Sequence, residues 1–190
     1  MVCKYSYFLI IFPNIQWINH SKIRIMEAKK VLTRENIPTD ELQRSVEKEF
    51  NGIRLTYIES YYFDYEVNED TGIINKEQKV RYYTKEQLNR NMKALKSAYL
   101  IAKGAASPNE IIEFRNKYHI AASTLSIILG FSKNTISNIE NEGITSLPSG
   151  RLIKMCLNNK DIMYGYIKVC DAIDNQKKEE ISKNLMQQGI

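Results

Sequence analysis

The sequence predicts an α+β protein in which a small strand-containing N-terminal region precedes an all-helical C-terminal region. The strands are predicted from residues 53–67, IRLTYIESYYFDYEV, which are rich in β-branched and aromatic side chains and lead into the turn-forming residues 68–72, NEDTG. The helices are predicted from two helix-start patterns, TKEQ at residues 84–87 and SPNE at residues 107–110. Beyond Gly104, short apolar-patterned runs end at glycines, which is typical of consecutive short helices.

The composition is that of a globular protein. Its 190 residues are 43% hydrophobic, which is enough to bury a core in one domain of ordinary size or in two small ones. The formal net charge of +5 permits an anionic partner without identifying one. Because the 3 cysteines, Cys3, Cys156 and Cys170, form no CxxC pair, we expect no disulfide framework and no metal site. We also expect no cofactor, and we predict a reducing, cytoplasmic location.

Residues 1–25 contain the apolar run YSYFLIIFPNIQWI, which is too short and too interrupted to cross a membrane and is followed by no cleavage signal. Two interpretations stay open: the segment is an N-terminal strand, or it is extraneous upstream sequence and the protein starts at Met26. Residues 26–83 are predicted to form a small N-terminal region with a β-hairpin. In its first part, residues 26–50, scattered apolar side chains predict one or two short helices around Pro38.

The predicted hairpin pairs residues 53–67 with residues 73–83 across the turn at residues 68–72. The outgoing arm and the turn are acidic and the returning arm is basic, so cross-strand ion pairs account for the charges without a ligand. We favour this interpretation over an acidic cluster that binds a metal or performs acid–base chemistry. The acidic residues are Glu59, Asp64, Glu66, Glu69 and Asp70, and the basic residues are Lys76, Lys79 and Arg81.

Residues 84–104 are predicted to form a connecting helix, because Thr84 and Gln87 make a capping box and Gly104 ends the pattern. The apolar side chains that recur at helical spacing are expected to face the protein: Leu88, Met92, Leu95, Ala98 and Tyr99. The opposite face is basic, and we interpret it as a solvated surface or, alternatively, as one that contacts phosphates: Lys85, Arg90, Lys93 and Lys96.

Residues 105–158 are predicted to form a series of short helices. The first, SPNEIIEFRNKY, is followed by a second, AASTLSIILG, which stops at Gly130. Ser132 is placed to cap a third helix, KNTISNIEN, which turns Ile136 and Ile139 inward. A further amphipathic run, SGRLIKMCLN, completes this region.

Residues 159–190 are predicted to form C-terminal helices. An apolar stripe in this segment either finishes the helical core or makes a symmetric dimer contact, and the sequence leaves both interpretations open. The stripe consists of Ile162, Tyr166, Val169 and Ile173.

The third helix also has a polar leading edge. A helix of about eight residues is stable only with support from neighbouring side chains, which leaves its exposed front turn free to contact a partner. Lys133, Asn134, Ser137 and Asn138 are short donors and acceptors with one cation, the chemistry that reads base edges in the DNA major groove. The N-terminus of a helix also attracts phosphate oxygens. The competing interpretation is that these residues only cap the helix, as Ser, Thr and Asn commonly do.

Residues 120–143, IAASTLSIILGFSKNTISNIENEG, resemble the helix-turn-helix of the lambda repressor and Cro-like proteins, the XRE-type family. The residues that carry the resemblance are Ile120, Leu125, Leu129, Gly130, Ser132, Thr135, Ile136, Ile139, Glu140 and Gly143. The resemblance implies a lambda-repressor-like domain in which residues 123–129 form the supporting helix and residues 133–140 the recognition helix. The DNA-binding residues that it implies are Ser123, Ser132, Lys133, Asn134, Thr135, Ser137 and Asn138.

The sequence departs from that family at one point. Ala121 and Ala122 stand where the family has a polar pair that holds a phosphate. Residues 105–158 are also nearly neutral, so a monomer is expected to bind DNA weakly, because neutralised phosphates supply most of the non-specific affinity. Dimerisation, or help from the basic helix at residues 84–103, is needed to compensate, and we expect a homodimer on double-stranded operator DNA.

A narrower resemblance covers residues 53–158, which look like the MqsA-type antitoxins of type II toxin–antitoxin systems. The matching pieces are a strand-rich segment, a helix that ends AYLIAKG, the run SPNEIIEFRNKY and the ending NIENEGITSLPS. The resemblance implies a protein that represses its own operon and binds a cognate toxin. This chain lacks the zinc-binding cysteines of that family, since none lies between Cys3 and Cys156.

The sequence therefore predicts a sequence-specific DNA-binding transcriptional regulator, an antitoxin that represses its own operon. The alternative is a protein-interaction module that neutralises a partner toxin without strong DNA binding. An enzyme is not expected, because the chain has no GxxxxGK[ST], GxGxxG, HExxH or GxSxG pattern. Its 2 histidines, His20 and His119, have no cysteine partner nearby.

Overall fold

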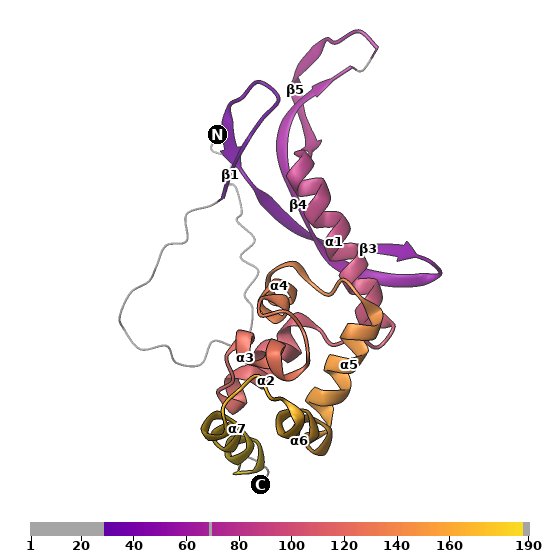
Figure 1. Cartoon of the computed structure of the whole chain (residues 1–190). Helices are drawn as coiled ribbons and strands as arrows, with labels where there is room; N and C mark the ends of the chain where they lie inside the picture. The colour runs from indigo at the N-terminus through magenta and orange to yellow at the C-terminus, as the bar shows by residue number, and fades with distance from the viewer. Residues whose placement is uncertain (1–28, 69, 188–190) are drawn as a thin grey trace, which may run out of the picture.

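The computed structural model describes residues 29–68 and 70–187, so residues 1–25, for which two interpretations were open, lie outside the described part. Strands come first along the chain and helices follow, in agreement with the predicted α+β class (Figure 1). The strands are β1 Lys30–Leu32, β2 Pro38–Asp40, β3 Leu42–Phe50, β4 Ile53–Val67 and β5 Ile74–Tyr82. The helices are α1 Lys85–Ala102, α2 Pro108–Tyr118, α3 Ala122–Ile128, α4 Thr135–Glu142, α5 Leu147–Asn158, α6 Lys160–Val169 and α7 Asn175–Gln187.

The long strand β4 organises the strand-rich part. Its first half pairs antiparallel with β3, from Ile53 to Tyr61, and its second half pairs with β5, from Tyr62 to Val67. The predicted hairpin is therefore confirmed for residues 62–67 and 74–82, whereas residues 53–61 pair with β3 instead of the returning arm. Because β3 and β5 lie on opposite edges of β4, each half of β4 has a strand partner on one edge only.

The prediction of short helices within residues 26–50 is wrong. The described part of this segment forms β1, β2 and β3, and β1 pairs antiparallel with β2. The sequence of β3, LQRSVEKEF, is rich in Glu, Lys and Gln, which are good helix formers. Pairing with the strongly β-forming residues of β4 overrides that local preference.

The predicted ion pairs across β4 and β5 are also wrong. Glu59 pairs with Arg44 of β3 at 2.6 Å, and Asp64 pairs with Arg34 of the β1–β2 connection at 3.6 Å. Among the described residues, no ion pair joins β4 to β5. The register explains this, because Tyr65 rather than an acid stands opposite Lys79, whose ammonium lies 5.1 Å from the centre of the tyrosine ring.

Helix α1 begins with the predicted capping box, and Leu95 is buried as predicted, but the N-terminal half of the helix differs from the prediction. Thr84 and Gln87 cap each other's backbone N–H groups as expected. Leu88 and Met92, expected to face inward, are 50% and 67% exposed, whereas Gln87 and Asn91 are buried. The Asn91 amide accepts a hydrogen bond from the Ser60 N–H at 2.8 Å and donates one to the Ser60 carbonyl at 2.9 Å. Asn91 thus replaces the missing neighbour strand at this point of β4.

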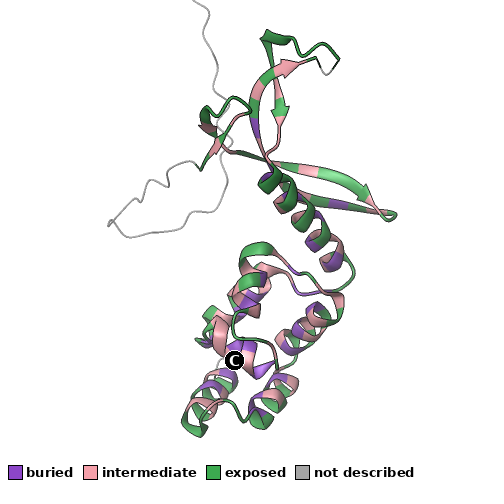
Figure 2. Cartoon of the chain, turned by 45° about the horizontal axis from the view of Figure 1, so that its top comes forward, coloured by how far each residue is buried: buried purple, intermediate pink, exposed green. Residues whose placement is uncertain are grey.

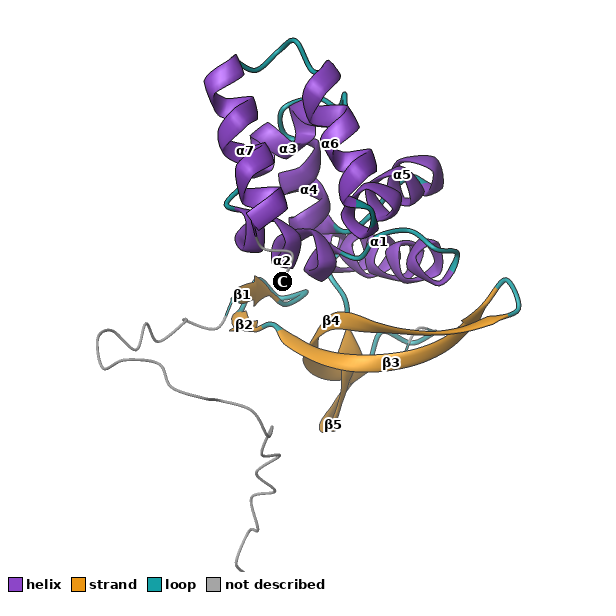
Figure 3. Ribbon diagram, turned by 90° about the horizontal axis from the view of Figure 1, so that it is seen from below, coloured by secondary structure: helices purple, strands orange, loops and turns teal. Residues whose placement is uncertain are grey.

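The helices share one hydrophobic core that extends from Leu100 of α1 to Leu185 of α7. Met163 and Ile167 of α6 are buried in it. In Figure 2 the buried residues lie where the helices face one another, and in Figure 3 the helices form one body with the strands along its side. Of the predicted C-terminal stripe, Ile162, Tyr166 and Ile173 pack against this core, whereas Val169 is 78% exposed.

Candidate nucleic-acid interface

Helices α3 and α4 are held together by apolar side chains. The chain turns between them at Gly130, whose φ of 75° lies in the left-handed region that glycine adopts without strain. Leu125 and Ile128 of α3 are buried, and Ile136 and Ile139 of α4 are 0% and 5% exposed. The prediction that Ile136 and Ile139 turn inward is confirmed.

The start of α4 differs from the prediction. The helix begins at Thr135, with Asn134 at the N-cap, so Ser132 is not the cap and Lys133 lies outside the helix. The Thr135 N–H donates to the Ser132 carbonyl at 2.9 Å, and the two side-chain hydroxyls hydrogen-bond at 2.8 Å. A hydrogen-bonded turn over residues 132–135 therefore occupies the place predicted for the first helical residues.

The backbone at the start of α4 is capped from α3 instead. The Ser126 hydroxyl accepts a hydrogen bond from the Ile136 N–H at 3.0 Å and donates one to the Ala122 carbonyl at 2.9 Å. Ser126 is fully buried. It was not among the predicted site residues, although a serine between the buried Leu125 and Ile128 could have indicated a buried polar contact.

The other end of α4 is fixed by polar contacts with α2 and α1. Arg115 of α2 contacts both carboxylate oxygens of Glu140, at 2.5 and 2.9 Å, and also donates to the Ile120 carbonyl at 3.0 Å. The Ser97 hydroxyl of α1 accepts the Ile144 N–H at 3.0 Å just after α4. Glu140, a position of the resemblance, therefore positions α4 and is not free for a partner.

The leading edge of α4 remains exposed. Of the predicted DNA-binding residues, Ser132, Lys133, Asn134 and Asn138 are exposed, and Thr135, Ser137 and Ser123 are half-buried. All but Ser123 lie on α4 or in the turn before it, and Ser123 lies in the first turn of α3.

The side chains at the front of this edge are not used for capping. The Asn134 side chain accepts no capping hydrogen bond, and Ser137 donates only to the Asn134 carbonyl, at 3.1 Å. Within the described ranges, the side chains of Lys133, Asn134 and Asn138 have no hydrogen-bond or ion-pair partner.

The basic residues around α4 are mostly neutralised. Arg115 pairs with Glu140, and Lys154 pairs with Glu110, whose pKa is lowered by the Lys154 ammonium and by the Ser107 N–H. On α1, Arg90 pairs with Glu41 and Lys93 with Glu142, so half of the face considered for phosphate contacts carries paired charges. Lys133 is the cation of the leading edge itself.

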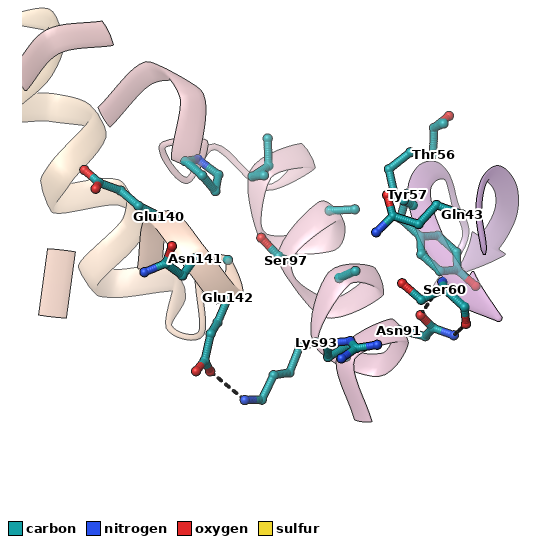
Figure 4. Close-up of a pocket in the computed structure, with 17 residues that line it drawn as sticks. Gln43, Thr56, Tyr57, Ser60, Asn91, Lys93, Ser97, Glu140, Asn141 and Glu142 are labelled. Atoms are coloured by element: carbon teal, nitrogen blue, oxygen red, sulfur yellow. Dashed lines mark hydrogen bonds and ion pairs between the residues drawn. The ribbon is translucent and has the colours of Figure 1, made fainter. Parts of the chain in front are cut away.

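A groove of about 580 Å³ lies behind α4, between β4, α1 and the C-terminal end of α4. Figure 4 shows Thr56, Tyr57 and Ser60 on the strand side and Glu142 on the α4 side, with the Lys93–Glu142 ion pair at its border. Burial raises the pKa of the Tyr57 hydroxyl. From Ile53 to Tyr61, the β4 edge opposite β3 has no strand partner in the part of the chain that the structure describes.

Other chemistry is limited in the described part of the chain. Cys156 is a buried free thiol whose pKa burial raises to about 11, and Cys170 is buried as well. Across residues 29–68 and 70–187, no three His, Cys, Asp or Glu side chains gather closely enough to hold a metal ion. None of the described helices combines the length and the apolar character that a membrane crossing requires. Comparisons with protein-family models, curated proteins and solved structures found no match to this chain.

Proposed function

We propose that this chain is a sequence-specific DNA-binding transcriptional regulator in which α3 and α4 act as a helix-turn-helix. One observation carries the proposal: α4 is fixed by buried isoleucines and by contacts at both ends, yet the side chains of Lys133, Asn134 and Asn138 at its leading edge are exposed and have no partner among the described residues. The competing capping interpretation does not account for this edge, because Ser126 caps the helix and the Asn134 side chain makes no capping bond.

The chemistry of this edge suits duplex DNA. The amides of Asn134 and Asn138 can each donate and accept, which is what bidentate contact with a base edge in the major groove requires. Lys133, in the turn before the N-cap Asn134, adds a positive charge near the end of the helix where its dipole favours a phosphate. Because α4 is fixed to α2 and α3 before binding, little ordering entropy opposes its insertion into the groove.

We further propose that the protein acts as a homodimer and represses its own operon as an antitoxin. A single leading edge with one lysine neutralises few phosphates, so a second copy is needed for useful affinity. Twofold symmetry would place two α4 helices on half-sites about 34 Å apart or a multiple of it. The antitoxin part of the proposal draws on the resemblance of residues 53–158 to MqsA-type antitoxins, with the strand-rich part as the region that contacts a toxin.

The alternative, a protein-interaction module without strong DNA binding, is favoured by a different observation. The β4 edge between Ile53 and Tyr61 has no strand partner among the described residues and opens onto the groove beside α1, and of its backbone groups those of Ser60 are already bonded by Asn91. An extended segment of a partner can add to such an edge as a further strand. The groove and the leading edge of α4 are separate surfaces, so the two functions can be tested independently.

Footprinting on the DNA upstream of the protein's own gene tests the proposal. We expect protection of a repeated half-site, and we expect Asn134→Ala to weaken binding by about 1–3 kcal/mol without changing the fold. Asn89→Ala, an exposed asparagine of α1, is the matched control and should bind like the unchanged protein. Equal affinity of the Asn134 variant and the control would favour the protein-interaction alternative.

The antitoxin part has its own test. The open reading frame next to this gene should be toxic when expressed alone and harmless when expressed with this protein. If the product of that reading frame is harmless when expressed alone, the antitoxin proposal is contradicted and the DNA-binding proposal is unaffected.

A further inference from the structure

The outer face of α4 carries a row of asparagines. Asn134, Asn138 and Asn141 are all exposed. Their spacing places them on one side of the helix, about one per turn. Asn141 was not among the DNA-binding residues predicted from the sequence. If α4 enters the major groove, Asn134 and Asn138 face the base edges. Asn141 continues the row at its far end, where it also lines the groove between β4, α1 and α4.

The amides of these asparagines are available for base contacts. Asn134 and Asn138 use none of their side-chain donors or acceptors within the described ranges. Asn141 donates one hydrogen to the Ser137 carbonyl at 2.8 Å, which leaves it a second N–H and its amide oxygen. A bidentate contact with adenine needs one N–H for N7 and one oxygen for the N6 amino group, so all three side chains retain what it requires.

Residues able to read guanine are scarce in the same region. The commonest guanine contact is a bidentate arginine on O6 and N7. Residues 122–143 contain no arginine, and the nearby Arg115 is held by Glu140. Lys133, at one end of the row, is the cation that could reach a guanine.

We propose that the DNA half-site read by α4 is rich in adenine–thymine pairs, with adenines opposite the asparagine row and guanine confined to the end beside Lys133. The inference rests on the proposed DNA-binding function and specifies the bases that this function selects. The inference is carried by the unpaired carboxamides of Asn134 and Asn138, which Asn141 continues, together with the lack of a free arginine in residues 122–143 and at Arg115.

Selection of bound duplexes from a random library by the full chain, followed by sequencing, tests the inference. We expect enriched half-sites with adenines at the positions that face α4. Replacing one such A·T pair by G·C should weaken binding by about 5- to 150-fold. Enriched half-sites dominated by G·C pairs would overturn the inference and leave DNA binding intact. Failure to retain any sequence preferentially would overturn both the inference and the proposed function.

Variants of Asn138 sharpen the test, because its side chain is exposed and supports no other residue. Asn138→Arg should shift the preference at one position from adenine to guanine, since a guanidinium matches O6 and N7. Asn138→Gln should keep adenine, because glutamine makes the same bidentate contact, and Asn89→Ala should leave the selected site unchanged. An unchanged site with Asn138→Arg would contradict the inference at that position.

Discussion

Helix α4 and the N-terminal half of α1 are oriented by opposite kinds of side chain, whereas Leu95 and Leu100 further along α1 are buried. In α4, the apolar Ile136 and Ile139 are buried and the polar residues face outward. In α1, the polar Gln87 and Asn91 are buried at the N-terminal end, and the apolar Met92 faces outward. Both helices carry apolar residues at helical spacing, so the difference lies in what each helix packs against.

The difference follows from the neighbours of each helix. Helix α4 packs on α2 and α3, whose own backbone groups are satisfied within helices, so apolar burial decides its rotation. Helix α1 packs beside an edge of β4, where the Ser60 backbone needs a donor and an acceptor. An unsatisfied buried polar group costs about 1–3 kcal/mol, which is comparable to the gain from burying one apolar side chain. Beside that edge, hydrogen bonding decides the rotation.

The largest effect is expected from removing an apolar anchor of α4. Ile136→Ala should lower the free energy of unfolding by about 2–5 kcal/mol, because it leaves a cavity at a fully buried position. Urea denaturation measures this change. The matched control is Ile58→Ala on β4, where the side chain is 52% exposed and the expected change is within about 0.5 kcal/mol. Similar losses at both positions would contradict the burial argument.

The second prediction tests the polar orientation of α1. Asn91→Ala should destabilise the protein by about 1–3 kcal/mol, because the Ser60 N–H and carbonyl lose their partners. Its neighbour Met92, at 67% exposure, is the control, and Met92→Ala should change stability by less than about 0.5 kcal/mol. A larger loss of stability from Met92→Ala than from Asn91→Ala would contradict the comparison between the two helices.

The third prediction concerns the cap that α3 provides for α4. Ser126→Ala should cost about 1 kcal/mol, the typical loss for a helix cap, because the Ile136 N–H is left unpaired. Thermal unfolding measures the loss. Ser132→Ala is the matched control, since that exposed hydroxyl caps no backbone group. A larger loss of stability from Ser132→Ala than from Ser126→Ala would mean that Ser132 caps α4, as the sequence predicted.

The smallest effect is a pH dependence at the start of α2. The Lys154 ammonium, and then the Ser107 N–H, lower the pKa of Glu110 from its ordinary value of 4.5. A lowered pKa in the folded state gives stability that is present above pH 4.5 and is lost as the pH falls through the folded-state value. Stability measured from pH 7 downward should therefore fall less steeply in Glu110→Gln than in the unchanged protein. Identical pH profiles for Glu110→Gln and the unchanged protein would mean that Glu110 does not contribute this stability.

Apolar spacing and capping patterns were sufficient to predict most of the helical half. Thr84 and Ser107 cap their helices with the predicted partners, and Ile136 and Ile139 face inward. The errors arose where long-range polar contacts decide the structure. The hydrogen-bond partners of Asn91 and Ser126 could not be derived locally, because each side chain bonds a backbone group elsewhere in the chain.

The leading edge of α4 shows the same limit. Its residue types were enough to predict a polar, exposed edge, but the start of the helix was predicted two residues too early. The hydroxyl contact of Ser132 with Thr135 and the cap from Ser126 together set that start, and neither can be read from the local pattern of small polar residues.

The central claim is that the leading edge of α4, and not the groove beside β4, contacts DNA. The most direct measurement is the change in backbone amide resonances when the protein is titrated with the duplex identified by footprinting. The account predicts that the largest changes fall on residues 133–138, with little change in β3 and the first half of β4. Largest changes along β4 and α1, with residues 133–138 unaffected, would contradict it.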